Sequence, residues 1–349
     1  RKLKPNYFIH GDDWKSGIQK EKRNKVVSYL KKINSKLIEV PYTKNISSKE
    51  IKEQLNIYFN TYSRVSYLKR LIDNKKLVRI LESHSPLTGI MIDNLSVAKK
   101  NKFEEYDGMW SSSLTDSSLR GRPDNQALDY SSRLSFLSDI IDVTKKPVIF
   151  DADNGGNIEH IKYLSKSLER IGVSSMVIED KIGLKKNSLF SDQSKTKQDS
   201  IKNFCKKIEK IKNTRSSKDF LITARIESFI VGKGLKDAIK RAEAYSKAGA
   251  DLILIHSKQK TPKEVFLFAK EFKKNKFYKP IVIVPSSYSK TSEKEMIKNG
   301  IKVVIYANHM LRASYKSMEK VAKNILLKGR SYDIEKTILP IKNIISLIK

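Results

Sequence analysis

The chain has almost no cysteine and no long apolar run. Its single cysteine, Cys205, excludes an internal disulfide framework and a cysteine-based zinc site. Apolar runs such as Ile281 to Val284 have the length of a strand, and none approaches the roughly 18 residues that a membrane span needs. Glycine and proline are too scarce, at 14 and 9 residues, to indicate a disordered chain. We therefore expect a soluble globular protein of the reducing cytoplasm with no membrane partner.

Arginine is also scarce, although the chain is strongly basic. Of the 70 basic residues 14 are arginine and 56 are lysine, and with 38 acidic residues the net charge is +32. Phosphate-reading surfaces usually rely on arginine for bidentate contacts, whereas lysine is spread along this whole chain. The distribution favours a solvated lysine-rich surface without a nucleic-acid partner. A basic polyanion-binding protein is the alternative of a different class, because a charge of this size attracts nucleic acid.

Eight short apolar runs, each followed by polar residues and a helical pattern, dominate the rest of the chain. Runs that are apolar on both faces are typical of parallel strands covered by helices. Eight such units in roughly 280 residues predict an α/β fold, a (β/α)8 TIM-type barrel, with a doubly wound open sheet as the alternative. The runs are 77–81, 106–110, 147–150, 176–178, 220–224, 251–255, 281–284 and 303–306.

Residues 1–60 do not follow this rhythm. Strands are predicted at Tyr7 to Ile9 and Leu37 to Val40, a helix near Arg23 to Ile33, and serine caps before a further helix at Ile46-Ser47-Ser48. We therefore expect a small, incomplete α/β segment over 1–60 and a barrel with C-terminal helices over 61–349.

The polar residues directly after the eight runs are the candidates for chemistry, because these loops form the active face of a barrel. They are Glu82, Ser83 and His84; Ser111, Ser112 and Ser113; Asp151 and Asp153; Glu179, Asp180 and Lys181; Arg225 and Glu227; His256 and Ser257; Pro285 to Ser287; and Asn308 and His309.

Three carboxylates in this set suggest a metal site. Asp151, Asp153 and Glu179 follow two neighbouring predicted strands. Hard oxygen ligands suit Mg²⁺, which keeps several waters and binds through one or two carboxylates. Helix capping by Asp153 and ordinary surface charge are the alternative interpretation.

The loop after Glu179 continues to about Lys197 without an apolar pattern and carries Lys185, Asn187 and Ser188. A loop of this length at a barrel mouth is often a lid. Lys185 and Asn187 are suited to neutralise and hydrogen-bond a migrating phosphoryl group. A solvated loop in a lysine-rich protein is the alternative.

Two further pairs complete the candidates. Arg225 lies at the end of a predicted barrel strand, where a buried guanidinium needs a carboxylate or phosphate partner. Either a ligand or the nearby Glu227 can be that partner. His256 either contacts a ligand or is a core histidine whose hydrogen bonds are satisfied within the protein. The turn Trp110 to Ser113, with Asp124, can hold an oxyanion through backbone N–H groups and hydroxyls, or is simply a polar turn. No nucleotide-binding loop motif is present in the barrel.

Together these residues resemble a known signature. Asp151-Ala152-Asp153, Glu179-Asp180-Lys181 and Lys185-x-Asn187-Ser188-Leu189 resemble the signature of the phosphoenolpyruvate mutase family, in the isocitrate lyase/mutase superfamily. The resemblance covers about 62–330. The run Asp153-Asn154-Gly155-Gly156-Asn157 is one residue shorter than the form frequent in the family, and the catalytic cysteine motif of the lyases is absent.

The resemblance implies an isomerase that interconverts phosphoenolpyruvate and phosphonopyruvate, the step that forms the C–P bond in phosphonate biosynthesis. It implies Mg²⁺ anchored by Asp151, with Asp153 and Glu179 in a water-mediated shell. At the carboxylate and carbonyl end of the substrate the implied contacts are Arg225, Ser112 and Ser113, and Trp110 and Leu189 are further implied substrate contacts. The implied contacts of the phosphoryl group are His256 and Asn187, with Lys185 and Ser188 on the closing lid. Asp124 is implied near the reacting phosphorus, as a nucleophile or as a positioning group.

Other expectations accompany the resemblance. A phosphonopyruvate hydrolase is the near alternative, and a non-catalytic scaffold barrel is a more distant one. Family members assemble as dimers or tetramers, and 332–349 is suited to exchange between subunits. His10-Gly11-Asp12-Asp13-Trp14 and Ile46-Ser47-Ser48 resemble the C-terminal part of a cytidylyltransferase. Residues 1–60 are thus expected to be a truncated remnant of such an enzyme without nucleotidyl transfer, and a fused or separate cytidylyltransferase is an expected partner.

Overall fold

The computed structural model describes residues 5–15, 19–41, 63–99, 102–183, 185–188, 193 and 196–348. The chain divides into two compact units, Arg1–Tyr58 and Phe59–Lys349, and each is described by itself. Ile46-Ser47-Ser48 and Leu189, on which two of the expectations rest, lie outside the described residues.

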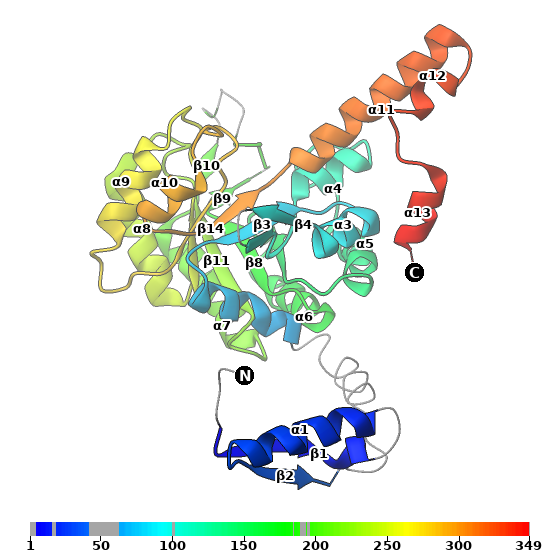
Figure 1. Ribbon diagram of the computed structural model, residues 1–349. Helices are drawn as coiled ribbons and strands as arrows, with labels where there is room; N and C mark the ends of the chain where they lie inside the picture. The colour runs from blue at the N-terminus through cyan, green and yellow to red at the C-terminus, as the bar shows by residue number, and fades with distance from the viewer. Residues whose placement is uncertain are drawn as a thin grey trace. The chain divides into compact units, whose positions relative to one another are not determined.

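The larger unit is a closed barrel of eight parallel strands (Figure 1). They are β3 (Val78–Glu82), β6 (Gly108–Ser111), β7 (Val148–Asp151), β8 (Ser175–Glu179), β11 (Leu221–Ile226), β12 (Leu252–Ile255), β13 (Ile281–Ile283) and β14 (Ile301–Tyr306). Each strand pairs with the next in this order, and β14 pairs with β3 to close the ring. The predicted barrel is confirmed, each of the eight runs forms a strand, and closure excludes the open doubly wound sheet.

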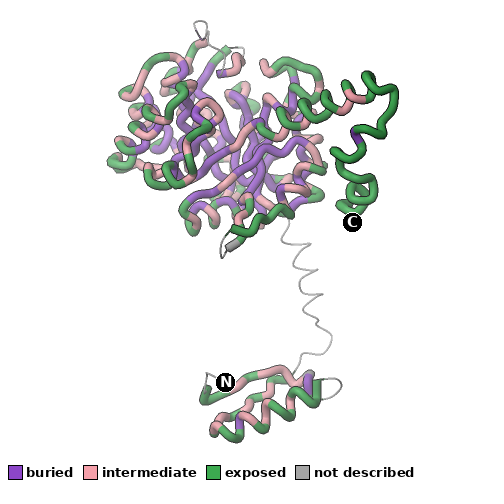
Figure 2. Tube along the Cα trace, turned by 45° about the horizontal axis from the view of Figure 1, so that its top comes forward, coloured by how far each residue is buried: buried purple, intermediate pink, exposed green. Residues whose placement is uncertain are grey.

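Helices surround the strands, and the residues of the central strands are mostly buried (Figure 2). The helices are α3 (Pro86–Asn94), α4 (Ser113–Leu119), α5 (Tyr130–Asp142), α6 (Ile161–Ile171), α7 (Ile201–Thr214), α8 (Gly234–Ala248), α9 (Lys263–Phe272) and α10 (Glu293–Lys298). On α7 the buried Phe204, Ile208 and Ile211 recur at helical spacing and face the strands. A second cluster fills the barrel interior, where Leu68 and Ile72 of the helical stretch 63–74 join the strand residues.

Two small antiparallel pairs interrupt the βα rhythm, and the sequence did not predict them. Strands β4 (Ser96–Lys99) and β5 (Lys102–Glu105) pair between α3 and β6. Strands β9 (Lys181–Ile182) and β10 (Lys197–Gln198) pair at the two ends of the expected lid segment. The second pair fixes where that segment leaves the barrel and where it returns.

The C-terminal helices are exposed. They are α11 (His309–Lys328), α12 (Tyr332–Glu335) and α13 (Ile341–Leu347), and α11 extends away from the barrel in Figure 1. No residue of α11 is buried, and Leu326 and Leu327 are 84% and 83% exposed. Ile334 of α12 is buried, but apolar side chains such as Leu326 and Leu327 lack a covering partner within the described chain.

The smaller unit contains a parallel pair of strands, β1 (Tyr7–Gly11) and β2 (Lys36–Val40), connected through the 3-10 turn η1 (Asp12–Lys15) and α1 (Lys20–Lys32). Trp14 and Leu30 are its buried apolar side chains among the described residues. The strands and the helix thus lie where the sequence predicted them.

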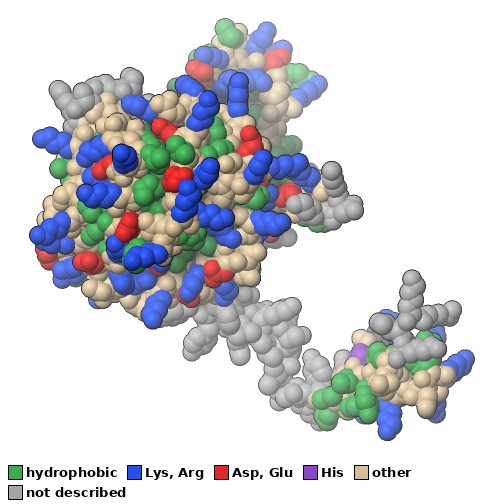
Figure 3. Space-filling view, turned by 90° about the vertical axis from the view of Figure 1, so that its left-hand side faces the viewer, with side chains coloured by type: hydrophobic (Ala, Val, Ile, Leu, Met, Phe, Trp, Pro, Cys, Tyr) green, Lys and Arg blue, Asp and Glu red, His purple; other side chains and the backbone are tan. Residues whose placement is uncertain are grey.

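Charge is distributed rather than gathered. Figure 3 shows Lys and Arg side chains spread over the visible face of the barrel unit, with Asp and Glu side chains between them. This pattern fits the predicted lysine-rich surface better than a focused polyanion site. Within the described part of the chain, no helix combines the length and the apolar character required to cross a bilayer.

Candidate active site

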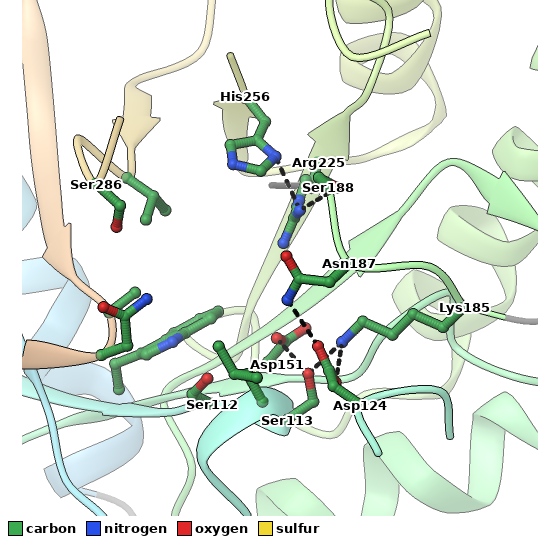
Figure 4. A pocket seen from close by; sticks show the side chains of 15 residues that line it. Ser112, Ser113, Asp124, Asp151, Lys185, Asn187, Ser188, Arg225, His256 and Ser286 are labelled. Atoms are coloured by element: carbon green, nitrogen blue, oxygen red, sulfur yellow. Dashed lines mark hydrogen bonds and ion pairs between the residues drawn. The ribbon is translucent and has the colours of Figure 1, made fainter. Parts of the chain in front are cut away.

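A small cavity of about 60 Å³ lies where the C-terminal ends of the barrel strands converge (Figure 4). Most of the predicted site residues line it, and they come from strands far apart in the sequence. Its lining consists of Trp110, Ser112, Ser113, Leu114, Asp124, Asp151, Lys185, Asn187, Ser188, Arg225, His256, Val284, Ser286, Ala307 and Asn308. Asp153 and Glu179 are not part of this lining, and Leu189 lies outside the described residues.

One end of the cavity is acidic. Asp151 ends β7, and its two carboxylate oxygens accept hydrogen bonds from Ser113 Oγ at 2.9 Å and from the Asp153 backbone N–H at 3.2 Å. Burial alone would raise the pKa of Asp151, but the charges of Lys185, Arg225 and Arg133 outweigh it and lower this pKa to about 2. Asp151 is therefore an anion at every working pH.

Arg133 supports this end from behind, and the sequence analysis missed it. Its side chain is fully buried on α5, where Nε donates to Asp116 Oδ2 at 2.8 Å and Nη1 donates to the Asp151 carbonyl at 2.6 Å. The guanidinium also lies over the Phe150 ring, 4.3 Å from its centroid. A signal existed, because Arg133 shares the apolar stripe of α5 with Leu137 and Ile140. A charge in an apolar stripe needs buried partners.

Lys185 reaches from the lid segment into the acidic end. Its ammonium lies 2.8 Å from Asp124 Oδ1 and also contacts Asp153 and Ser113. Asn187 Nδ2 donates to the other Asp124 oxygen at 2.9 Å. Both oxygens of Asp124 thus hold the lid segment, as the dashed lines in Figure 4 show.

The opposite end is cationic and centres on Arg225. Its Nε donates to Glu227 Oε1 at 2.6 Å, and its Nη2 lies 3.1 Å from Ser188 Oγ and 2.9 Å from His256 Nδ1. Glu227 is therefore the internal partner that the sequence left as an alternative, and Arg225 still lines the cavity. One guanidinium can bind Glu227 and a ligand in the cavity at the same time, because it presents several donors in a rigid plane.

Glu227 contacts the other polar side chains of the cationic end. Besides Arg225, it accepts from Ser188 Oγ at 2.6 Å and lies 3.0 Å from His256 Nδ1. Burial and the Arg225 charge lower the pKa of His256 below its usual 6.5, although Glu227 opposes them. The imidazole is consequently neutral at physiological pH, so it can hydrogen-bond an anion without a fixed charge.

Asp180 anchors the base of the lid segment to this end. It is fully buried and accepts from the Glu227 backbone N–H at 3.0 Å and from Gln198 Nε2 at 2.9 Å. From α8, Tyr245 Oη donates to it at 2.7 Å and Arg241 Nη1 at 3.1 Å. Gln198 belongs to β10, so one carboxylate joins the returning end of the lid segment to the backbone of Glu227.

The carboxylates of the acidic end are the candidate metal ligands of the predicted magnesium site. The described residues contain no group of three or more His, Cys, Asp or Glu side chains placed to hold a metal ion. Magnesium needs fewer protein ligands, because it keeps several waters. Asp151 offers an ionised carboxylate, and Glu179 Oε2 is buried without a hydrogen-bond partner in the described chain. These donors fit one direct ligand and further contacts through water.

Comparison with known proteins agrees with this geometry. The family described as "Phosphoenolpyruvate phosphomutase" matches residues 68–326. A phosphoenolpyruvate phosphomutase of Tetrahymena pyriformis is 34% identical over 294 residues, covering 84% of this chain and 94% of that protein. A phosphonopyruvate hydrolase of Variovorax sp. (strain Pal2) is 32% identical over 282 residues, covering 80% and 93%.

Solved structures give the same picture. A phosphoenolpyruvate phosphomutase from Streptomyces platensis subsp. rosaceus superposes with a TM-score of 0.73 at 33% identity, covering 81% of this chain and 94% of that one. A phosphonopyruvate hydrolase in complex with oxalate and Mg²⁺ superposes with a TM-score of 0.72 at 30% identity, with the same coverage. Mutases and a hydrolase are thus about equally similar to this chain.

Proposed function

This chain belongs to the phosphoenolpyruvate phosphomutase family, and on that premise we propose that it interconverts phosphoenolpyruvate and phosphonopyruvate. The observation that carries the proposal is the double attachment of the lid segment. Lys185 and Asn187 bind Asp124 on one side, while Ser188 binds Glu227 and Arg225 on the other. Residues 185–188 thus bond to both sides of the cavity and can cover it against water, and a phosphoryl group that must reach carbon instead of water needs that exclusion.

Mg²⁺ is part of the proposal. Asp151 would bind it directly, and Asp153 and Glu179 would do so through water; a magnesium complex is known for the similar hydrolase. When bound, the ion would supply positive charge that stabilises the carboxylate and enolate oxygens of the substrate. Lys185 now neutralises Asp153 and Asp124 at this end.

The pyruvyl end of the substrate is assigned to the turn after β6. Ser112 and Ser113 line the cavity beside Asp151, and Ser112 caps the N-terminus of α4. Hydroxyls and backbone N–H groups at such a turn suit a carboxylate. The Trp110 ring lines the same side of the cavity and gives the flat pyruvyl group an apolar surface.

The phosphoryl group is assigned to His256 and Asn187. Arg225, which the sequence analysis placed at the pyruvyl end, is assigned to the phosphoryl group as well, because its Nη2 lies 2.9 Å from His256 Nδ1. In the reaction the bond from phosphorus to the C2 oxygen breaks, its electrons stay on the enolate oxygen, and C3 of the enolate forms the new bond to phosphorus. The charge on the transferring group spreads over three oxygens. A guanidinium, a neutral imidazole and an amide provide fixed donors for it.

We assign Asp124 as a positioning group. A nucleophilic carboxylate needs an oxygen free to attack phosphorus, and both oxygens of Asp124 accept bonds from Lys185 and Asn187. Its role is then to hold the lid segment over the substrate.

The test uses phosphonopyruvate, Mg²⁺ and ³¹P NMR on the full chain. A phosphoenolpyruvate signal that disappears with chelator and in Asp151→Ala supports the mutase. Release of inorganic phosphate together with pyruvate assigns a phosphonopyruvate hydrolase, which the similarity to the Variovorax enzyme makes the second candidate. An unchanged spectrum refutes both and leaves polyanion binding, which a steep salt dependence would reveal.

The exposed C-terminal helices support a homo-oligomer. We assign α11 and α13 to contacts with a second copy, because Leu326, Leu327, Ile341 and Ile345 are all at least 65% exposed. Isolated apolar side chains on a surface are ordinary, but a series of them along neighbouring helices marks an interface.

Residues 1–60 are assigned as a separate α/β segment, and 61–349 as the catalytic barrel. The parallel pair β1–β2 with α1 between them is half of a nucleotide-binding α/β unit, which is consistent with a cytidylyltransferase remnant. Incubating the full chain with CTP, Mg²⁺ and a hydroxyalkylphosphonate should yield no pyrophosphate.

A further inference from the structure

Three polar atoms that line the cavity have no hydrogen-bond partner among the described residues: Trp110 Nε1, Ser286 Oγ and Asn308 Oδ1. Trp110 and Asn308 are 97% and 92% buried, since only 3% and 8% of their surfaces are exposed. A buried polar group without a partner costs about 1–3 kcal/mol, so such groups are rare unless a ligand or an ordered water satisfies them. The sequence analysis placed Ser286 and Asn308 at strand ends but gave them no role.

The ring order of the strands says which part of a ligand these residues meet. Asp151 and Glu179 end β7 and β8, whereas Ser286 and Asn308 follow β13 and β14. In the closed order, β13 lies four places from β7 and β14 lies four places from β8. Ser286 and Asn308 therefore lie across the barrel mouth from the acidic end.

Their neighbour in the ring is the cationic end. His256 follows β12, which pairs with β13, and Figure 4 shows Ser286 at the end of the cavity where His256 lies, away from Asp151, Ser112 and Ser113. A doubly charged group is repelled by the acidic end and attracted to Arg225 and His256. Ser286 and Asn308 are thus placed beside that group.

Asn308 is also held rigidly. It directly precedes α11, whose first backbone N–H groups, those of Met310 and Leu311, both donate to Glu82 Oε2 at 3.1 Å. Glu82 is fully buried and also bonds His84 Nδ1 at 2.6 Å. A fixed backbone on one side of Asn308 gives its amide a defined position, as recognition of an oxygen requires.

We propose that Ser286 and Asn308 form an uncharged wall that binds oxygens of the phosphoryl group opposite Arg225 and His256. This rests on the proposed function and deepens it. Arg225, His256 and Asn187 meet the phosphoryl oxygens from one side. On the remaining side the Ser286 hydroxyl and the Asn308 Nδ2 group can donate to them, whereas Asn308 Oδ1 can only accept, as it would from a protonated phosphoryl oxygen or a bound water. Val284 and Ala307, which also line the cavity, add apolar surface next to the wall.

The test compares two inert ligands on the full chain with Mg²⁺, by isothermal titration calorimetry. Oxalate mimics the pyruvyl enolate alone, and 3-sulfopyruvate adds a tetrahedral sulfonate in place of the phosphonate. Ser286→Ala and Asn308→Ala should each weaken 3-sulfopyruvate binding by about 10- to 100-fold and change oxalate binding by less than about twofold. Retained oxalate binding shows that each variant is folded with an intact acidic end.

Three results would overturn the wall: equal losses for both ligands, no loss for 3-sulfopyruvate, or no binding of 3-sulfopyruvate by the unaltered chain. The outcome is separate from that of the proposed reaction. If the unaltered chain releases only inorganic phosphate from phosphonopyruvate, the mutase assignment fails while the ligand comparison still decides the wall. If it makes phosphoenolpyruvate, the two alanine variants should also release a larger share of inorganic phosphate.

Discussion

Lys185 Nζ lies 2.8 Å from Asp124 Oδ1, and this ion pair joins the lid segment to the acidic end of the cavity. Both side chains are less than one-tenth exposed, so the pair is screened little by solvent. Burial would lower the pKa of Lys185, but Asp151, Asp153 and Asp124 together raise it above its ordinary value. Lys185 of the lid segment is therefore held in place by charge that a bound cation would compete for.

Asp124→Asn should loosen the lid segment while leaving the size of the side chain at position 124 nearly unchanged. The carboxylate of Asp124 offers one oxygen to Lys185 and the other to Asn187, whereas an amide has only one oxygen that can accept. One of the two hydrogen bonds is therefore lost. We expect kcat to fall by about 10- to 100-fold and the share of inorganic phosphate among the products to rise. Quantitative ³¹P NMR of phosphonopyruvate turnover measures both.

Asp219→Asn is the matched control, because Asp219 forms an ion pair with Lys69 at the same 2.8 Å on the exposed surface. It should leave rate and product ratio unchanged. An Asp124→Asn variant with normal kcat and products would remove the lid role of Asp124, and complete loss of turnover with intact oxalate binding would point back to a nucleophile.

Arg225→Lys should disable the cationic end although the charge is kept. Lysine has one nitrogen where arginine contacts Glu227, Ser188 and His256 at once. The expected loss in kcat/KM is about 10²- to 10³-fold. Arg215→Lys changes another partly buried arginine, which pairs with Asp251; it should cost stability but keep kcat/KM within about threefold. Equal losses in the two variants would mean that Arg225 acts only through folding.

The barrel was predictable because of how its strands are buried. Parallel strands covered on both faces require continuous apolar runs, and such runs are visible without knowledge of their partners. The observed strands differ from the predicted runs only in their boundaries: β14 begins at Ile301 instead of Val303, and β6 begins at Gly108 instead of Tyr106. The residues after the runs then followed from the barrel rule, which is why Asp151, Arg225 and His256 were found together.

The support behind the site was less visible in the sequence. Arg133 lies on a helix, and no pattern near it in the sequence indicates that Asp116 and the Asp151 carbonyl are its partners. The hairpin β4–β5 was missed because its strands are short and its described side chains are mostly exposed. Contacts of this kind depend on tertiary packing, which local patterns do not encode.

Gly155→Ala should distort the turn that carries Asp153. Gly155 has φ +78°, and an added Cβ would lie 2.5 Å from Ile161 Cδ1 and 3.1 Å from Ile178 Cγ2, both in the core. We expect the free energy of unfolding to fall by about 2–4 kcal/mol, measured by urea denaturation. Gly121→Ala, at φ +61° with no atom within 4 Å of the added Cβ, isolates the backbone strain and should cost about 1 kcal/mol. Equal losses would mean that the core accommodates the methyl group.

Leu326→Glu combined with Leu327→Glu should weaken self-association. The two side chains are 84% and 83% exposed on α11, and burying charges in an apolar interface is unfavourable. Sedimentation velocity should show the unaltered chain as a species larger than its 40.1 kDa monomer and the variant shifted toward the monomer. Tyr163→Glu, at a 61% exposed position on α6, should not shift it. A monomeric unaltered chain would contradict the assigned interface.

Asp151→Asn should make the chain's stability less dependent on acid pH. The folded-state pKa of Asp151 is lowered to about 2, from 3.8, because Lys185, Arg225 and Arg133 outweigh its burial. A group with a depressed folded pKa stabilises the fold above its unfolded pKa, and this contribution is lost as the pH falls from about 4 toward 2. The difference between the two pKa values corresponds to about 2 kcal/mol.

Urea unfolding in chelator should therefore show a gap in the free energy of unfolding between the unaltered chain and the variant that is constant from pH 8 to 5. That gap should narrow by about 1 kcal/mol by pH 3 and by about 2 kcal/mol as the pH approaches 2. A gap that stays constant down to pH 3 would show that Asp151 is not held as an anion by these three cations.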